Sequence, residues 1–258
     1  MTKTFFMLTI SIGLLPFFAK AQKQREFYEI TIYHFKNGEQ EKTVDAFLRE
    51  SYLPGLHKKG INRIGVFKPL LNDTAADKLI YVVLPLKTLQ QLIALPEQLF
   101  NNKDFLQSGK EYLEAPYKNP PYTRMEKIVL KAFQLAPVMN LPQLKGPKQE
   151  RIFELRSYES ATEKLYHNKV QMFNSGGEIT LFARLNFNPV FYAEVISGSH
   201  MPNLMYMTSF ENITARDAHW KTFGEDPEWK KLSSMPEYQN NVSKAEITLM
   251  HATDYSDY

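Results

Sequence analysis

Hydrophobic and polar positions follow two periods along this chain, and the switches between them define the elements. From Arg25, the sequence REFYEITIYHF alternates with a period of two and predicts a strand in which Tyr28, Ile30 and Ile32 share a face. Further elements follow in turn: a helix at about 41–57, strands at 61–70 and 78–85, a helix from Leu89, and a strand at 124–133. This order predicts a ferredoxin-like βαββαβ unit.

Proline is expected to interrupt both of these helices. Pro54 falls inside the first helical pattern and Pro96 inside the second. Because proline lacks a backbone N–H and its ring clashes with the preceding turn, we expect a kink or an end at Pro54 and a break at Pro96.

The same order begins again in the second half of the chain. Residues 134–150 contain three prolines and a glycine with no sustained period, which is typical of a linker. The sequence RIFELRSY then repeats the first strand, with Glu154 at the position of Glu29 and Tyr158 at that of Tyr33, each 125 residues later. We therefore divide the mature chain into an N-terminal unit (22–133), a linker (134–150) and a C-terminal unit (151–258).

The stretch from Pro202 to Leu232 predicts the second half of the C-terminal unit. A run of β-competent residues is followed by a helix with Ile213, Trp220 and Phe223 on one face. Thr214 and Asp217 resemble a capping box at its start. Asp226 is a good N-cap for a further helix, since Pro227 would then occupy its first position.

Two such units predict a larger α+β fold. Each unit has a four-stranded antiparallel sheet with both helices on one face, which leaves the other face without cover. The two bare faces can close on each other as a pseudo-dimeric α+β barrel, or the units can remain separate. In the C-terminal unit, one face carries Phe153, Leu155, Phe191, Ala193 and Val195, and the other carries Tyr192, Glu194, Tyr206 and Thr208. The pattern does not say which face is covered by helices.

The N-terminus has the three parts of a secretory signal peptide. Lys3 is followed by an apolar run from Phe5 to Phe18 and by Ala19-Lys20-Ala21, an A-x-A cleavage site. We expect residues 1–21 to be removed and the mature protein to be periplasmic or secreted, with a retained membrane anchor as the alternative.

Composition excludes several kinds of chemistry. The chain has no cysteine, which rules out disulfides, thiolate metal sites and cysteine nucleophiles. Its formal net charge of +3 and the absence of a long basic run argue against nucleic-acid binding. No G-x-S-x-G turn is present, so a serine hydrolase is not expected.

Five motifs in the second half resemble the NIPSNAP family. They are FELRSY (153–158), HNKVQMFNSGGE (167–178), the stretch 185–191 with NPVF, MPNLMYM (201–207) and DPEWKKL (226–232). The resemblance implies a dimeric α+β barrel, in a ferredoxin-like superfamily that includes cofactor-independent monooxygenases and haem-handling proteins. It implies no settled reaction. The N-terminal unit lacks an MFNSGGE equivalent, so we expect a single site built mainly from the second repeat.

The candidate site residues lie in that second repeat. Ligand-binding candidates are Met172, Phe173, Asn174, Arg184, Phe191, Met201, Asn203, Tyr206, Trp220 and Trp229. His167 and Glu178 are the candidate acid or base, because burial can move the pKa of such groups toward neutrality. We expect five polar side chains to point into the barrel: Asn203, Tyr206, His167, Arg184 and Glu178. The alternative is that the aromatic and methionine side chains are ordinary core.

Two other sites are weaker hypotheses. Residues 174–178 (NSGGE) could bind an anion through converging N–H groups, although an ordinary turn explains them as well. His167, His200 and Glu178 could bind a metal, but their spacing matches no metal motif, so neither a metal nor a cofactor is expected.

Three functions therefore remain open. The first is an exported NIPSNAP-type barrel that binds a small, largely apolar ligand. The second is a cofactor-independent monooxygenase-like enzyme that holds an electron-rich ring and O₂ in a dry pocket. The third is a scaffold for partner proteins. Homo-oligomers are compatible with all three, whereas nucleic-acid binding and stable membrane insertion after signal removal are not expected.

Overall fold

A computed structural model describes residues 24–258, so the predicted signal peptide lies outside the described part of the chain. The strands are β1 (Phe27–Phe35), β2 (Gly65–Pro69), β3 (Lys78–Leu86), β4 (Arg124–Ala132), β5 (Ile152–Glu159), β6 (Asn188–Ser197), β7 (Asn203–Phe210) and β8 (Lys244–Ala252). The helices are α1 (Gly38–Phe47), α2 (Leu53–Lys58), α3 (Leu89–Phe100), α4 (Lys103–Ser108), α5 (Lys110–Leu113), α6 (Glu163–Phe173), α7 (Glu178–Arg184), α8 (Ile213–Glu225) and α9 (Pro227–Ser234). Within 24–258, no helix has both the length and the apolar character needed to cross a bilayer.

The eight strands form one closed antiparallel barrel in the order β1-β3-β2-β8-β5-β7-β6-β4. Each unit contributes four neighbouring strands in the ferredoxin-like order, β4-β1-β3-β2 and β8-β5-β7-β6. The units join where β2 pairs with β8 and where β4 pairs with β6. The predicted α+β barrel of two tandem βαββαβ units is thus confirmed.

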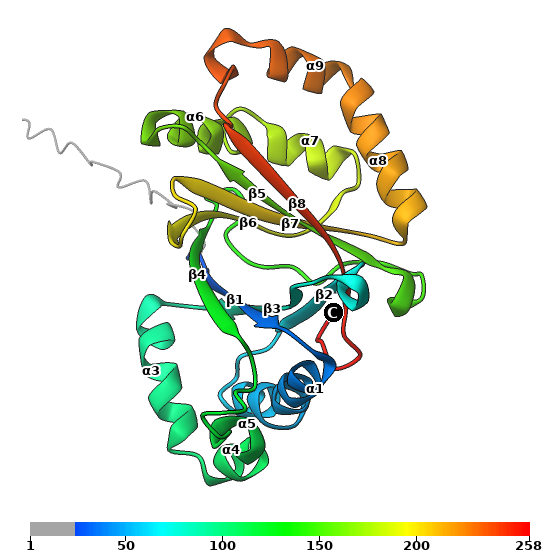
Figure 1. Ribbon diagram of the computed structural model, residues 1–258. Coiled ribbons are helices and arrows are strands. Elements are labelled where there is room, and N and C mark those ends of the chain that lie inside the picture. Colours follow the sequence, from blue (N-terminus) through cyan, green and yellow to red (C-terminus); the bar gives the residue numbers. More distant parts are fainter. Residues whose placement is uncertain (1–23) are drawn as a thin grey trace, which may run out of the picture.

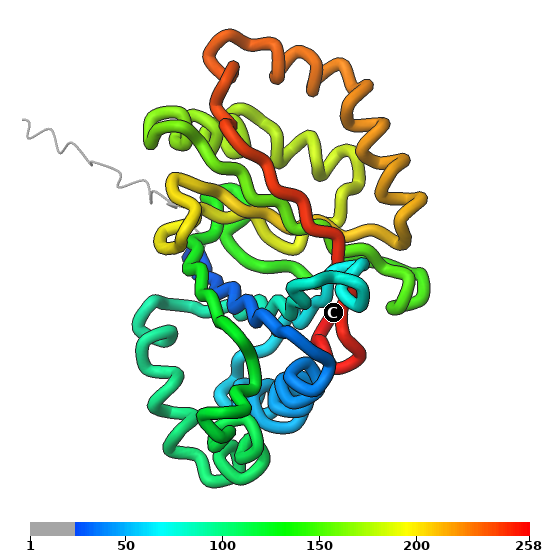
Figure 2. The backbone as a smooth tube through the Cα atoms, viewed as in Figure 1, coloured from blue at the N-terminus to red at the C-terminus, as the bar shows by residue number. Residues whose placement is uncertain are grey.

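Helices cover the outside of the barrel on two opposite sides (Figures 1 and 2). α1–α5 lie against the sheet of the N-terminal unit, and α6–α9 lie against that of the C-terminal unit. Three apolar clusters result: one inside the barrel and one beneath each helical layer. Alternation along the strands decides which cluster a residue joins, so Phe153 and Leu155 lie inside, whereas Tyr192 and Tyr206 lie beneath the helices.

The two units match residue by residue. Thr88 and Asn212, 124 residues apart, are the N-caps of α3 and α8, and Asn102 and Asp226 are the N-caps of α4 and α9 at the same offset. Strand registers also agree, since Thr31 lies opposite Val82 as Arg156 lies opposite Tyr206. We call residues related in this way matched positions.

Two local predictions about helix ends were wrong, at Pro96 and at the start of α8, and of the two alternatives predicted at Pro54 the helix end was wrong. α3 continues through Pro96, because Leu95 and Leu99 on its buried face hold the helix in place despite the missing N–H. The first helix does not end at Pro54 either: a π-helical turn (Leu48–Tyr52) leads into α2, whose first turn contains Pro54 and does not require that N–H.

The other wrong prediction concerns the start of α8. Asn212, not Thr214, caps this helix by accepting a hydrogen bond from Ala215 N–H. Asn is a strong N-cap residue, and its use starts the helix two residues earlier than a cap at Thr214 would.

Candidate functional site at one end of the barrel

The inward side chains change from apolar to polar toward one end of the barrel. On β1 the inward residues Tyr28, Ile30 and Ile32 are followed by His34. On β5, Phe153 and Leu155 are followed by Ser157 and then, by alternation, Glu159. We call this polar end the barrel mouth.

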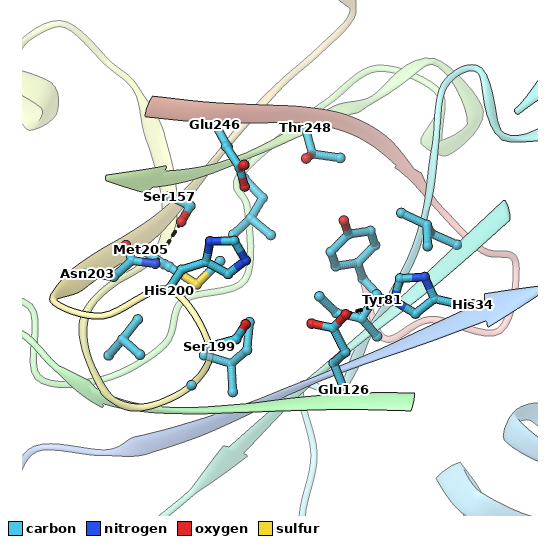
Figure 3. A pocket seen from close by; sticks show the side chains of 16 residues that line it. His34, Tyr81, Glu126, Ser157, Ser199, His200, Asn203, Met205, Glu246 and Thr248 are labelled. Carbon is cyan, nitrogen blue, oxygen red and sulfur yellow. Dashed lines mark hydrogen bonds and ion pairs between the residues drawn. The ribbon is translucent and has the colours of Figure 1, made fainter. Parts of the chain in front are cut away.

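A cavity of about 180 Å³ opens at the barrel mouth (Figure 3). Its walls are apolar: Ile32, Leu79, Ile128, Leu155, Val195 and Met205. Polar groups gather around it: His34, Tyr81, Glu126, Ser157, His200, Asn203, Glu246 and Thr248. Both units contribute to both sets, so the site exists only because the barrel is closed.

His34 is the most heavily engaged of these polar groups. Its Nδ1 lies 2.7 Å from Asp77 Oδ2, in the turn before β3, and its Nε2 lies 3.2 Å from Glu126 Oε1. Arg124 also bonds to Glu126. His34 is 8% exposed, so it is a buried residue that both carboxylates reach from the mouth.

Across the mouth, His200 forms the corresponding pair with Glu159. Nδ1 of His200 lies 2.9 Å from Glu159 Oε1, and Lys244 contacts both Glu159 and Glu246. Three potential ligand atoms, one each from Glu159, His200 and Glu246, lie within 4.8 Å of one another, a spacing that could hold a cation. The ammonium of Lys244 already contacts both carboxylates, however, and His200 and Glu246 are exposed.

Two further groups at the mouth could orient a ligand. Asn203 is 3% exposed and donates from Nδ2 to Ser157 Oγ over 2.8 Å, while its Oδ1 is buried without a hydrogen-bond partner in the range 24–258. Burial raises the pKa of Tyr81, so its hydroxyl stays protonated at neutral pH. A buried acceptor without a partner is costly, and a ligand that supplies a donor would remove that cost.

Comparison with known families assigns the second half of the chain. The family model for NIPSNAP matches residues 153–257. These residues form a NIPSNAP domain. The motifs FELRSY, HNKVQMFNSGGE and DPEWKKL that predicted it lie on β5, on α6 with its following turn, and on α9. The mouth combines this domain with residues outside it, since His34, Tyr81 and Glu126 come from the N-terminal unit.

Three solved structures match the whole barrel and not only this domain. A Lactobacillus acidophilus protein provisionally named a monooxygenase has a TM-score of 0.58 at 11% identity, covering 88% of this chain and 94% of its own. A Fusobacterium nucleatum protein with the same provisional name has a TM-score of 0.56 at 7% identity, and the match covers 89% of this chain and 93% of that protein. An anthrone oxidase-like protein has a TM-score of 0.53 at 6% identity, and the match covers 90% of this chain and 93% of that protein. No curated protein matches the sequence. At these identities the likeness establishes the fold alone.

The structure does not bring the predicted ligand-binding residues of the NIPSNAP domain together. Of these, Asn203 lines the cavity at the mouth and Phe191 lies deeper inside the barrel. The other large side chains lie on or beneath the helices outside the barrel: Met172, Phe173, Tyr206, Trp220 and Trp229. The expectation that Tyr206 points into the barrel was wrong, because Met205 takes that direction and adjacent strand residues face opposite sides.

His167, Glu178 and Arg184 also lie away from the barrel interior, contrary to expectation. Glu178 begins α7, is 2% exposed, and forms an ion pair with Lys169 at 2.8 Å beneath the helices. Arg184 bonds to Asp226 at 2.8 Å on the surface. His167 lies on α6 with its ring 5.1 Å from that of Tyr166, at a tilt of 53°. Helical residues of this layer can reach the outer face of the sheet but not its inner face.

The remaining candidates lie in turns. Asn174 closes the turn after α6, since its Oδ1 accepts from Leu135 N–H and its Nδ2 donates to the Val170 carbonyl. Gly177 has φ of +100° and precedes α7, so ordinary turn chemistry accounts for the NSGGE segment. Met201 is half-exposed in the turn before β7.

Sequence reasoning missed His34, Asp77, Tyr81, Glu126 and Glu246. The sequence did contain a signal for four of them, because every second residue of a strand points inward and this pattern continues to the strand ends, where the residues are polar. Two positions along each strand separate the members of these inward pairs: Ile32 and His34, Ile128 and Glu126, Thr248 and Glu246, and Leu79 and Tyr81. Asp77 lies in a turn, where no periodic pattern could identify it.

Proposed function

We propose that this protein binds a small, largely apolar molecule carrying one hydrogen-bonding group at the barrel mouth. The apolar walls would hold the body of the ligand, and the polar end would face His34, Tyr81 and Asn203. The observation that carries the proposal is the buried Oδ1 of Asn203, an acceptor without a partner within 24–258 on a residue that lines this partly apolar cavity.

Filling the cavity tests this proposal. Val195 lines the mouth, whereas its neighbour Ile196 is 41% exposed on the other side of the same strand. Val195→Phe should therefore exclude the ligand, and Ile196→Phe, the matched control, should not. Each protein would be purified, denatured and extracted, and the extract analysed by mass spectrometry for a stoichiometric small molecule. We expect a bound small molecule in the extracts of wild type and Ile196→Phe but not in that of Val195→Phe. Equal amounts of this molecule in all three extracts would contradict the proposal.

A second candidate is a cofactor-independent oxygenase, favoured by the His34–Asp77 pair beside an apolar cavity. The Nδ1–H of His34 would donate to Asp77. Nε2, which lies 3.2 Å from Glu126 Oε1, would turn from that carboxylate to accept a proton from an acidic C–H of an electron-rich ring system. The resulting carbanion would give its electron pair to O₂ and form a hydroperoxide, R₂CHOOH. Loss of the remaining C–H proton with cleavage of the O–O bond would then release R₂C=O and H₂O, so that R₂CH₂ and O₂ balance the two products. The whole-chain likeness to proteins named as monooxygenases and as anthrone oxidase-like is consistent with this reaction.

Oxygen uptake with anthrone separates the two candidates. Anthrone has a methylene flanked by aromatic rings, and its uncatalysed oxidation can be subtracted. If His34 is the base, His34→Asn should lower the enzymatic rate by about 100-fold or more, and Asp77→Asn should lower it less. A His34→Asn protein as active as wild type, or no uptake above background, would leave binding as the function.

A further inference from the structure

A second cavity, of about 250 Å³, lies outside the barrel in the N-terminal unit. Its lining comes from the helix-facing side of the sheet, from Phe47 and Tyr52, and from the helices α3–α5. Aromatic and aliphatic side chains line it, with Tyr33, Phe47, Tyr52 and Tyr112 among them, and it holds one buried carboxylate, Glu29. The barrel mouth opens from the other face of the same sheet, so this cavity is a separate site.

The matched carboxylate in the NIPSNAP domain is Glu154, and it is fully satisfied. Arg156 and Arg216 both bond to its Oε1, and Arg216 and Trp220 both bond to its Oε2. The guanidinium of Arg156 also lies 3.6 Å from the centre of the Trp220 ring and donates to Tyr158 Oη over 2.9 Å. Two cations and an indole thus fill the space around this buried charge.

The N-terminal unit keeps the carboxylate but lacks all three of those side chains. Its matched residues are Thr31 for Arg156, Leu92 for Arg216 and Pro96 for Trp220. All three replacements line the second cavity. The cavity is therefore the space that the NIPSNAP domain fills with its own cations and aromatic ring.

Glu29 is left with an open acceptor. It is 4% exposed, and both of its side-chain partners, Thr31 Oγ1 at 3.2 Å and Lys127 Nζ at 2.6 Å, bond to Oε1. Among the residues that the structure describes, none donates a hydrogen bond to Oε2. Lys127 supplies one charge from the half-exposed rim, whereas the matched carboxylate Glu154 is served by two guanidinium groups.

We propose that this cavity binds an organic cation, a primary ammonium on a short aromatic or apolar body. The ammonium would donate to Glu29 Oε2 and lie among the faces of Tyr33 and Tyr52, in the place that the Arg156 guanidinium takes in the NIPSNAP domain. The apolar body would lie between Phe47, Leu95 and Leu99. Exposed Phe100 and Met125 at the rim provide an apolar entrance.

Charge-matched probes test the proposal by titration calorimetry on the full mature chain. 2-Phenylethylamine should bind about 10-fold or more tightly than 2-phenylethanol, its neutral isostere, because a charge-assisted hydrogen bond is worth about 1.5–3 kcal/mol and 1.4 kcal/mol is a factor of ten. 3-Phenylpropionate should bind more weakly still. Equal affinity for the amine and the alcohol would overturn the proposal.

Supplying the missing cation within the chain is the sharper test. Thr31→Arg recreates the arrangement of Arg156 and should abolish amine binding without lowering the melting temperature. Thr74→Arg, on an exposed turn, adds the same charge elsewhere and should bind as wild type does. Undiminished binding by Thr31→Arg would also overturn the proposal. Should Thr31→Arg fail to fold, Glu29→Gln should reduce amine affinity to that of the alcohol, and a retained preference for the amine would count against the site.

Discussion

The two units share one backbone plan but fill the space beneath their helices differently. In the NIPSNAP domain, stacked aromatic rings and ion pairs occupy that space, with Phe182 against Phe223 and Arg156 over Trp220. In the N-terminal unit, the matched region is partly open and lacks the two cations and the indole ring. Because caps and strand registers agree at matched positions, the fold tolerates both arrangements, and the side chains that fill the space decide where a cavity remains open.

The largest expected effect concerns a buried ion pair that only one unit has. Lys169 and Glu178 are both nearly inaccessible to solvent, and their matched residues are the buried Val44 and Leu53. Lys169→Val alone should cost about 3–5 kcal/mol of unfolding free energy, because it leaves Glu178 buried and unpaired. Combining Lys169→Val with Glu178→Leu would copy the N-terminal unit and should recover most of that loss.

Urea denaturation of the two single variants and the double variant measures this coupling. A double variant as unstable as the sum of the two single changes would mean that the units are not interchangeable at these positions.

A somewhat smaller effect is expected from making the NIPSNAP domain resemble the N-terminal unit. Arg156→Thr removes one of the two cations at Glu154 while Arg216 remains, so we expect a loss of about 2 kcal/mol. The space left should then accept an organic cation, and 2-phenylethylamine should raise the melting temperature of this variant more than 2-phenylethanol does. Equal responses to the two compounds would contradict the comparison on which the second cavity was assigned.

The smallest effect is a difference in acid sensitivity between matched helix caps. Burial acts to raise the pKa of Asp226, but hydrogen bonds from Arg184 and from the N–H groups of Trp229 and Glu228 outweigh it and lower that pKa. A lowered folded-state pKa gives stability that is present above the unfolded pKa and is lost as the pH falls through the folded value. Asp226→Asn should therefore flatten the dependence of melting temperature on pH below about pH 4.

The matched cap in the N-terminal unit, Asn102, cannot titrate. Asn102→Asp should introduce an acid dependence there, provided that the cap hydrogen bonds to Asp104 and Phe105 N–H are kept. If plots of melting temperature against pH run parallel for wild type and both variants between about pH 3 and 7, then neither cap charge contributes to stability.

The sequence was sufficient for the fold because its signals are local and repeated. Short stretches of sequence are enough to identify the period-two strands, the N-cap at Asp226, and the repeat in which Glu154 follows Glu29 by 125 residues. It was insufficient for the site because the inner face of the barrel is defined only when β2 meets β8 and β4 meets β6. Phe191 and Tyr206 are both large aromatic strand residues in the sequence, yet one lies inside the barrel and the other beneath the helices.

Two methionines allow both sites to be observed in one measurement. Met205 lines the barrel mouth and Met125 lines the cavity beneath α3–α5. In protein labelled with ¹³C at the methionine methyl groups, hydroquinone, an electron-rich ring with hydroxyl donors, should shift the NMR signal of Met205, and 2-phenylethylamine should shift that of Met125. Each compound should leave the other signal in place. Shifts of both signals by both compounds, or of neither by either, would contradict an account in which one barrel holds two chemically distinct sites.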